Sequence, residues 1–174
     1  MQLDARLPQA HAQLGWVLFY KRQHDAAIAA FERAFALNPN FIDNRFGHVL
    51  THAGVPARAI EVLQANSRLD PFQPPAWLGF MGHAYYLLKR YDDAARLLRE
   101  CVSRFPNGQM PHVYLAAASA QLGQLVEARA EAQEILRINP GFTIGRRKRL
   151  AVYKDPKDAE HFFDGLRKAG LPQD

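Results

Sequence analysis

The sequence predicts an all-α protein built as a solenoid of helical hairpins, and three observations lead to this fold class. Four prolines recur at intervals of 32, 35 and 34 residues, a period that fits two helices with their turns. Fixed positions before each proline carry small or large apolar residues. The segments between turns have the apolar spacing of amphipathic helices. The prolines are Pro39, Pro71, Pro106 and Pro140.

The positions that repeat with the prolines explain how paired helices approach one another. Small residues let two helix backbones come close, and large apolar residues fill the space between hairpins. Each proline follows a second helix, where it cannot continue the helical hydrogen bonding. The small residues are Gly15, Gly47, Gly82 and Ala116 on the first helices, and Ala27, Ala59, Ala94 and Ala128 on the second. The large residues are Leu14, Phe46, Met81 and Leu115.

Turn signals divide the repeats into eight helices. Gly54 and Gly123 fall between paired helices, where a helix C-terminus favours glycine. Asn-Pro or Asp-Pro pairs mark three of the boundaries between hairpins. The expected helices span about 8–21, 24–37, 41–53, 56–68, 75–88, 91–104, 109–121 and 125–138.

A final helix is expected from residue 156 to residue 168. Asp155 would be its N-cap and Pro156 its first residue, and Gly170 follows its end. A solenoid exposes the apolar face of its last hairpin, so a helix that covers this face is expected. The covering side chains would be Phe162, Phe163 and Leu166.

The period and the repeated positions resemble the tetratricopeptide-repeat family over about residues 8–141. The resemblance implies a right-handed superhelix of helix-turn-helix repeats with a C-terminal capping helix. It implies a single domain, 1–174, with repeats at 8–39, 40–74, 75–108 and 109–142 and a basic segment with the capping helix at 143–174. Residues 1–7 look like the remnant of a preceding repeat, so we expect that the chain was cut from a longer protein.

A narrower resemblance involves the stretch from Leu69 to Pro75 and the ending from Asp164 to Pro172. Both are similar to the C-terminal repeat region of bacterial class III adenylate/guanylate cyclase-like signalling proteins. In those relatives a catalytic domain commonly precedes the repeats. The resemblance implies a regulatory or scaffolding role, and no cyclase residue can be carried over because none of the catalytic domain is present.

In the tetratricopeptide-repeat family the first helix of each hairpin lines a concave groove. Positions rotated away from the packing residues mix aromatic and hydrogen-bonding side chains, and few are acidic. Aromatic residues and arginine are favoured where binding energy concentrates. We therefore expect a protein or peptide segment with apolar anchors and acidic or carbonyl groups. The candidate groove residues are Gln13, Trp16, Tyr20, Asn44, Arg45, His48, His52, Phe80, His83, Tyr86, Met110, Tyr114 and Gln121.

Catalytic and cofactor chemistry is not indicated. No phosphate-binding Gly-rich loop and no set of acid, base and nucleophile emerges, so we expect neither an enzyme nor a cofactor. His48, His52 and His83 could form a zinc site, but no acid follows at metalloprotease spacing, and we expect histidines that line the groove. Cys101 occupies a small-residue position on the packing side of a helix and is expected in the core.

Charge and cysteine content bound the remaining choices. A single cysteine excludes an intramolecular disulfide and fits a reducing compartment, so a cytoplasmic protein without a membrane span is expected. The net charge is +5, and its densest positive run forms a candidate anion contact. Two alternatives stay open: a self-association module that dimerises an attached catalytic domain, and a nucleic-acid adaptor that uses this run. The run is Arg146, Arg147, Lys148 and Arg149.

Overall fold

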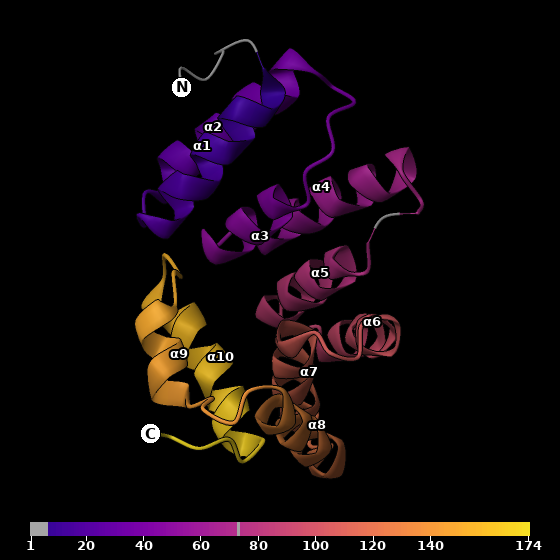
Figure 1. Ribbon diagram of the computed structural model, residues 1–174, viewed down its shortest axis with the longest axis vertical. Helices are drawn as coiled ribbons and strands as arrows, with labels where there is room; N and C mark the ends of the chain where they lie inside the picture. Colours follow the sequence, from indigo (N-terminus) through magenta and orange to yellow (C-terminus); the bar gives the residue numbers. More distant parts are fainter. Residues whose placement is uncertain (1–6, 73) are drawn as a thin grey trace. The chain divides into compact units, whose positions relative to one another are not determined.

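The computed structural model describes residues 7–72 and 74–174, which contain ten α-helices and no strand. The chain groups into two compact units. The N-terminal unit comprises the chain up to Gln73 together with Val152–Lys154, and the C-terminal unit comprises 74–151 and 155–174. Figure 1 labels the helices of both units. Among the described helices, none combines the length and apolar composition that a membrane crossing requires. The proposed repeat remnant at 1–7 lies outside the described residues except for Leu7.

The N-terminal unit consists of two helical hairpins. The first pairs α1 (Pro8–Tyr20) with α2 (His24–Leu37), and the second pairs α3 (Arg45–His52) with α4 (Pro56–Leu69). The expected start of the third helix, near residue 41, is wrong by four residues. Asp43 accepts the backbone N–H of Arg45 at 3.0 Å, and its carboxylate also lies 2.6 Å from the Arg45 guanidinium. Such side-chain bonds compete with helical ones and delay the start of the helix.

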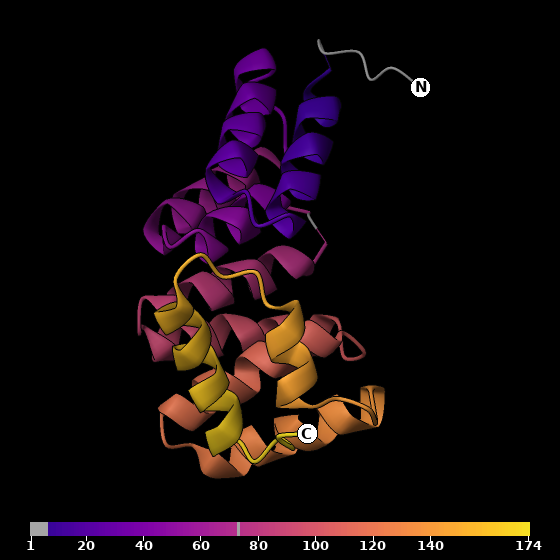
Figure 2. The ribbon, with the colours of Figure 1, turned by 90° about the vertical axis from the view of Figure 1, so that its left-hand side faces the viewer.

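The C-terminal unit contains the other two hairpins and the end of the chain. The hairpins are α5 (Ala76–Leu87) with α6 (Tyr91–Arg104) and α7 (Gln109–Gln121) with α8 (Leu125–Ile138). The final helix, α10, spans Pro156–Lys168, and the Asp155 side chain accepts the N–H of Lys157 at 2.8 Å. This confirms the expected helix and its N-cap. Figure 2 shows α10 beside α9.

The basic segment forms a short helix that was not predicted from the sequence, α9 (Ile144–Leu150). Thr143 caps it by accepting the N–H of Arg146 at 3.1 Å. The N–H groups of Ile144 and Gly145 donate to the carbonyls of Pro172 and Gln173, at 2.9 and 2.8 Å. The C-terminal tail therefore holds the start of this helix. Hydrogen bonds between residues so far apart in the sequence cannot be predicted from a local sequence pattern.

The small residues of the first helices lie where the sequence predicts a close approach. A Cβ atom on Gly82 would lie 2.5 Å from Leu98 Cγ, and one on Gly47 would lie 2.5 Å from Leu63 Cγ. No carbon atom fits at such distances, so these positions require glycine while the facing side chain is large. Leu14 departs from its expected role as a filler between hairpins. It is 47% exposed because no described hairpin precedes α1.

The turns inside the hairpins share one backbone conformation. Gly54 and Gly123, expected at these turns, have φ angles of 84° and 76°. Arg22 and Lys89 take the same place in the other two hairpins, with φ angles of 61° and 59°. This left-handed region favours glycine, because a Cβ atom there crowds the backbone. Two of the four turns therefore keep a side chain at a conformational cost.

Gly123→Ala is expected to lower the free energy of unfolding by about 1 kcal/mol. A Cβ atom at Gly123 meets nothing within 4 Å, so the cost comes from the backbone conformation alone. Urea unfolding followed by circular dichroism measures it. Gly141→Ala is the control, because that glycine has no left-handed φ and the nearest atom to its added Cβ belongs to the flexible Arg146 side chain. Equal effects of the two substitutions would contradict this explanation.

His112 forms a buried ion pair inside the last hairpin. Its side chain is almost fully buried, with Nδ1 2.5 Å from Glu131 Oε2 and Nε2 2.9 Å from the Pro106 carbonyl oxygen. Both ring nitrogens have acceptors, which favours the imidazolium form. The hydrogen bond to Glu131 is the main cause that raises the pKa of His112 above its ordinary value.

This pair predicts a pH dependence of stability. A histidine whose pKa is raised in the folded state stabilises it fully below the unfolded pKa of about 6.5, and this contribution is lost as pH rises through the folded pKa. The difference in unfolding free energy between wild type and His112→Asn should therefore be larger at pH 6 than at pH 8.5. Urea unfolding at the two pH values measures it. A difference that does not change with pH would show that His112 is not charged in the folded protein.

Candidate functional site

Five predicted groove residues of the N-terminal unit gather on α1 and α3. The Arg45 guanidinium lies 5.6 Å from the centroid of the Trp16 ring, and its Nη1 donates to Gln13 Oε1 at 3.1 Å. The Trp16 ring also lies beside those of Tyr20 and His48, with centroids 5.1 and 5.8 Å apart. Tyr20 is 59% exposed. These side chains form one partly exposed surface of aromatic and polar groups.

Asn44 and His52, the other two predicted groove residues of this unit, serve its internal packing. Asn44 Oδ1 accepts a hydrogen bond from Asn66 Nδ2 of α4 at 3.0 Å. His52 is buried, its Nδ1 lies 2.9 Å from the backbone oxygen of His48, and its ring lies 4.5 Å from that of Tyr153. The expectation of accessible groove positions therefore does not fit these two residues.

In the C-terminal unit, α10 lies against the face formed by α5 and α7. Phe162 of α10 is buried, and its ring centroid lies 5.5 Å from that of His83 and 5.7 Å from that of Tyr114. The His83 and Tyr114 rings stack on each other at 4.3 Å. A Cβ atom on Gly165 would lie 3.0 Å from the Cβ of Ala117, so the backbones of α10 and α7 approach closely.

Hydrogen bonds from polar side chains fix α10 on this face. The Tyr86 hydroxyl donates to the backbone oxygen of His161 at 2.8 Å. Gln121 Nε2 donates to Asp164 Oδ2 at 3.1 Å, and Lys168 Nζ donates to Gln121 Oε1 at 3.0 Å. Burial raises the pKa of the Tyr86 hydroxyl, which keeps it protonated as a donor. The contact is thus specific as well as apolar.

Four predicted groove residues of this unit are therefore engaged by the chain itself. The expected covering helix does contact α7 of the last hairpin, and it extends onto α5 of the hairpin before. The groove prediction assigned the same face to a ligand, and α10 occupies that face at the residues beneath it. The apolar face of α10 could have linked the prediction of a covering helix with the prediction of a groove. The apolar face of an amphipathic helix packs against another apolar surface, and the groove offers one. The covered groove residues are His83, Tyr86, Tyr114 and Gln121.

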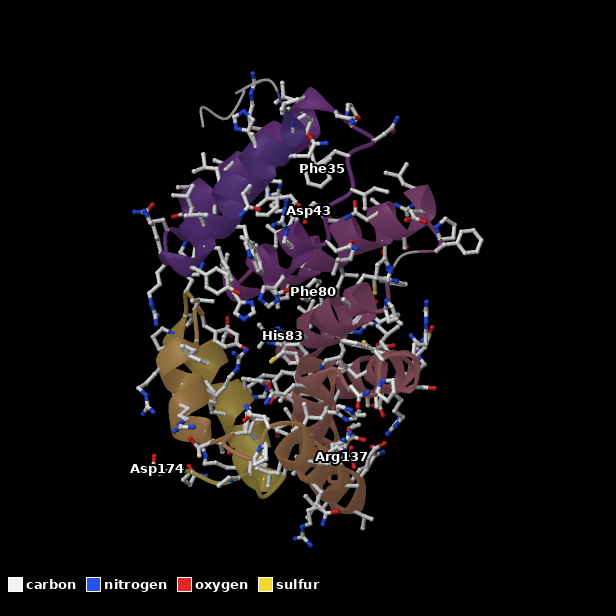
Figure 3. The ribbon with its side chains drawn as sticks, viewed as in Figure 1. Phe35, Asp43, Phe80, His83, Arg137 and Asp174 are labelled. Atoms are coloured by element: carbon white, nitrogen blue, oxygen red, sulfur yellow. The ribbon has the colours of Figure 1, made fainter. Side chains whose placement is uncertain are left out.

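An apolar pocket of about 330 Å³ adjoins this covered face, between the first turns of α5 and α7. Phe80 and Met110, the two remaining predicted groove residues, both line it, and the edge of Tyr114 contributes to its wall. Ala76, Phe105 and Pro111 add to the apolar lining and were not predicted. Figure 3 marks Phe80 and His83 on α5. Phe80 is half-buried at the pocket, while His83 is fully buried against α10.

A second, smaller pocket of about 200 Å³ adjoins the first. The two share Gln109 and Met110, and Arg146 and Arg147 of α9 line the second. The Arg146 guanidinium donates to the carbonyl oxygen of Gly141 at 3.1 Å. Two cationic side chains therefore lie next to an apolar pocket in the same unit.

The structure separates the four candidate anion contacts by role. Arg146 and Arg147 line the pocket. Lys148 pairs with Glu160 of α10 at 3.4 Å and lies over the Phe163 ring, so it helps to hold α9 against α10. Arg149 is exposed, and the described part of the chain provides no ion pair for it.

Cys101 lies in the core, as expected. It is fully buried, and its Sγ lies 3.2 Å from the carbonyl oxygen of Pro75. Burial raises the pKa of the thiol to about 11, so little reactive thiolate exists near neutral pH.

Comparisons with known proteins agree with the repeated hairpins. Two family descriptions, both named Tetratricopeptide repeat, match residues 8–41 and 85–144, which together exceed half of the chain. The TPR repeat-containing protein YpiA of Bacillus subtilis (strain 168) is 26% identical over 160 residues, or 91% of this chain. The chain spans only 37% of the length of YpiA.

Solved structures with the same fold include TTC0263 of Thermus thermophilus, a thermophilic TPR protein. It has a TM-score of 0.69 and 22% identity, with 93% of this chain and 89% of that chain covered. Another is YrrB, described as a TPR protein with an unusual peptide-binding site. Its TM-score is 0.60 at 16% identity, with 95% and 86% of the two chains covered. At these identities the likeness concerns the fold.

Proposed function

This chain belongs to the tetratricopeptide-repeat family, and from that premise we propose that it is a non-catalytic module that binds a peptide segment between α5 and α7. The observation that carries the proposal is the apolar pocket lined by Phe80, Met110 and Tyr114 next to the pocket lined by Arg146 and Arg147. Phe80 and Met110 are half-buried and keep exposed surface, whereas His83 and Tyr114 on the same two helices are buried under α10.

The two pockets together define the chemistry of the ligand. A volume of about 330 Å³ holds one large aliphatic or aromatic side chain, and its burial there removes apolar surface from water. Arginine suits carboxylates because its planar guanidinium can donate two parallel hydrogen bonds. A peptide with one large apolar residue and acidic residues close to it fits both pockets. The peptide-binding site described for YrrB supports the view that a fold of this kind can hold a peptide.

The test is a titration with short peptides, blocked at both ends, that carry one phenylalanine beside two aspartates. Phe80→Ala and Met110→Ala should each weaken binding about tenfold, which corresponds to about 1.4 kcal/mol of lost apolar contact. Replacing the peptide phenylalanine with serine should have a similar effect. Isothermal titration calorimetry on the full chain measures the affinities.

Phe72→Ala serves as the matched control, because Phe72 is 93% exposed and lies in the N-terminal unit. It should leave the affinity unchanged. Arg146→Gln and Arg147→Gln should weaken binding at low salt more than at high salt, since salt screens exposed charges. Equal affinity for wild type and both pocket variants would refute the assignment of this site.

Self-association is a second candidate, and one observation favours it. Leu14 and Val17 of α1 are 47% and 44% exposed, although large apolar residues at the position of Leu14 are buried in the other three hairpins. Burial of these side chains against another copy would remove apolar surface from water. Light scattering should then show a dimer that Leu14→Glu with Val17→Glu converts to a monomer. A monomeric wild type would eliminate this candidate.

The wider context proposed from the sequence is the C-terminal regulatory part of a nucleotide cyclase-like signalling protein. It is supported by the sequence resemblance alone, since the family descriptions and the relatives named above concern repeats and not cyclases. The reading frame upstream of residue 1 tests it. A frame without a catalytic domain would end this proposal and leave peptide binding untouched.

A further inference from the structure

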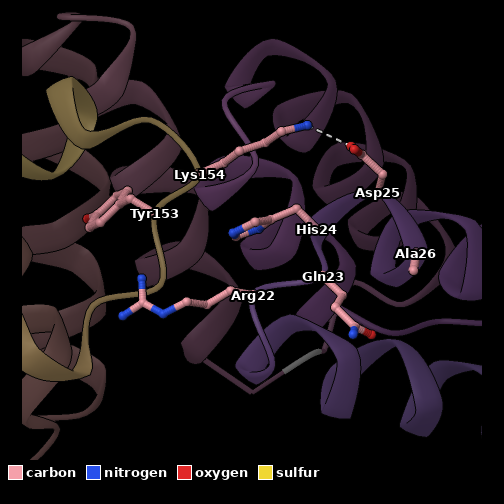
Figure 4. Close-up of a pocket in the computed structure, with 7 residues that line it drawn as sticks. All are labelled: Arg22, Gln23, His24, Asp25, Ala26, Tyr153 and Lys154. Carbon is pink, nitrogen blue, oxygen red and sulfur yellow. Dashed lines mark hydrogen bonds and ion pairs between the residues drawn. The ribbon is translucent and has the colours of Figure 1, made fainter.

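A cavity of about 400 Å³ lies in the N-terminal unit, at the start of α2 (Figure 4). Its walls come from the turn between α1 and α2, from the first turn of α2, and from Tyr153 and Lys154, which belong to the same unit. None of its residues belongs to the predicted groove or to the two pockets of the C-terminal unit. The lining residues are Arg22, Gln23, His24, Asp25, Ala26, Tyr153 and Lys154.

His24 is a buried polar side chain at this cavity whose bonding is incomplete. It is only 6% exposed, and Figure 4 shows its ring extending between the side chains of Arg22 and Lys154. Its Nδ1 is buried and has no hydrogen-bond partner among the described residues. A buried polar atom without a partner is costly, so the wall of this cavity holds an unsatisfied hydrogen-bonding group.

The first turn of α2 adds backbone donors to the same wall. The N–H groups at the first positions of a helix have no acceptor inside the helix, and the N-cap residue Gln23 makes no side-chain capping bond. The first N–H with a helical acceptor is that of Ala27, which donates to the Gln23 carbonyl oxygen at 2.9 Å. Free N–H groups and the helix dipole favour an anion at this place.

The charges around the cavity leave one cation unpaired. Lys154 Nζ lies 2.7 Å from Asp25 Oδ1, so these two charges compensate each other. The Arg22 guanidinium is exposed, and the described residues provide no carboxylate partner for it. Burial, followed by the nearby Lys154 and Arg22, lowers the pKa of His24, although Asp25 opposes this. His24 is therefore neutral at pH 7, and the lining carries one net positive charge.

We propose that this cavity binds a carboxylate group, held by the Arg22 guanidinium, the first N–H groups of α2 and the ring of His24. One net positive charge matches a singly charged carboxylate, whereas the Asp25 carboxylate at the rim would repel a phosphate dianion. Arginine binds a carboxylate through two parallel hydrogen bonds. The group can belong to the C-terminus of a peptide or to a free organic acid, which share this chemistry. The site uses residues of the N-terminal unit only and is independent of the peptide proposed for α5 and α7.

The test records amide chemical shifts of the full chain by NMR while four probes are added separately. The probes are an acetylated tripeptide with a free terminal carboxylate, the same tripeptide as its amide, phenylpropionate and inorganic phosphate. At least one carboxylate probe should shift the amide signals of His24, Asp25 and Ala26, and the amide probe should not. A response to the tripeptide alone identifies a peptide C-terminus, and a response to phenylpropionate alone identifies a free acid. No shift with either carboxylate, or tighter binding of phosphate, overturns the proposal.

Three variants distinguish a built site from general attraction to positive charge. Arg22→Gln should weaken carboxylate binding about tenfold, the effect of losing a charged hydrogen-bond partner. Asp25→Asn should strengthen binding about threefold or more, because it removes the competing carboxylate and frees Lys154. Lys21→Gln removes the same charge from the neighbouring residue, which does not line the cavity, and should change affinity less than twofold. Equal losses for Arg22→Gln and Lys21→Gln, in variants whose spectra show intact folding, would also overturn it.

Discussion

Phe162→Ala is expected to lower the free energy of unfolding of the C-terminal unit by about 3 to 5 kcal/mol. Phe162 is 1% exposed and lies among the rings of His83, Tyr86 and Tyr114. Removing the ring forfeits its burial and leaves a cavity that the stacked His83 and Tyr114 rings cannot fill without losing their own contacts. Urea unfolding followed by circular dichroism measures the loss.

Phe72→Ala is the control for this substitution, because it removes the same ring from a side chain that is 93% exposed. Its effect should stay within about 0.5 kcal/mol. A loss below 1 kcal/mol for Phe162→Ala would mean that α10 does not pack on α5 and α7 in solution. It would also restore His83 and Tyr114 as accessible groove residues.

Gly82→Ala is expected to destabilise the C-terminal unit by about 2 kcal/mol, although alanine favours helices by about 1 kcal/mol over glycine. The reason is steric, since the new Cβ would lie 2.5 Å from Leu98 Cγ. Gly79→Ala is the matched control on the same helix. Its Cβ would meet Cys101 Sγ at 3.6 Å, an ordinary contact, so this variant should be as stable as wild type or more stable.

A second substitution shows whether the clash with Leu98 is the cause. Leu98→Ala alone should cost about 2 to 5 kcal/mol, because the side chain is fully buried. In the double variant the small residue at position 98 leaves room for the new Cβ. The loss of unfolding free energy in the double variant Gly82→Ala with Leu98→Ala should then be smaller than the sum of the two single losses by about 1 kcal/mol or more. Strict additivity would show that Gly82 is required for another reason.

The residues that recur at fixed positions in each repeat made most of the fold predictable from sequence. Gly82 and Leu98 stand sixteen residues apart in the chain, and such fixed pairs recur, so contacts inside a hairpin are local and appear as a period. Gly123 indicates its turn by residue type. Arg22 adopts the same left-handed backbone conformation, but an arginine does not predict a turn. Helix α9 was missed because its start is held by carbonyls of Pro172 and Gln173, about thirty residues away.

The candidate site was predictable only in part. The structure brings Phe80 and Met110, which both lie on first helices of hairpins, to one pocket, and their part in binding stays a prediction. The fate of His83 and Tyr114 was not predictable, because it depends on where α10 lies. The end of α10 was clear from its capping residues, but no local pattern encodes the partner of an amphipathic helix. The ion pair of Lys154 with Asp25 of α2 was not predictable either, because the two residues are far apart in the sequence.

The most direct measurement of the central claim uses the methionine methyl groups. Met110 lines the pocket between α5 and α7, while Met81 is buried elsewhere on α5 and is 5% exposed. In methyl-labelled protein, the peptide that carries phenylalanine beside two aspartates should shift the Met110 methyl signal strongly through the ring current. The Met81 signal should change little. Binding of the peptide with an unmoved Met110 signal would contradict the account, because it would place the ligand outside this pocket.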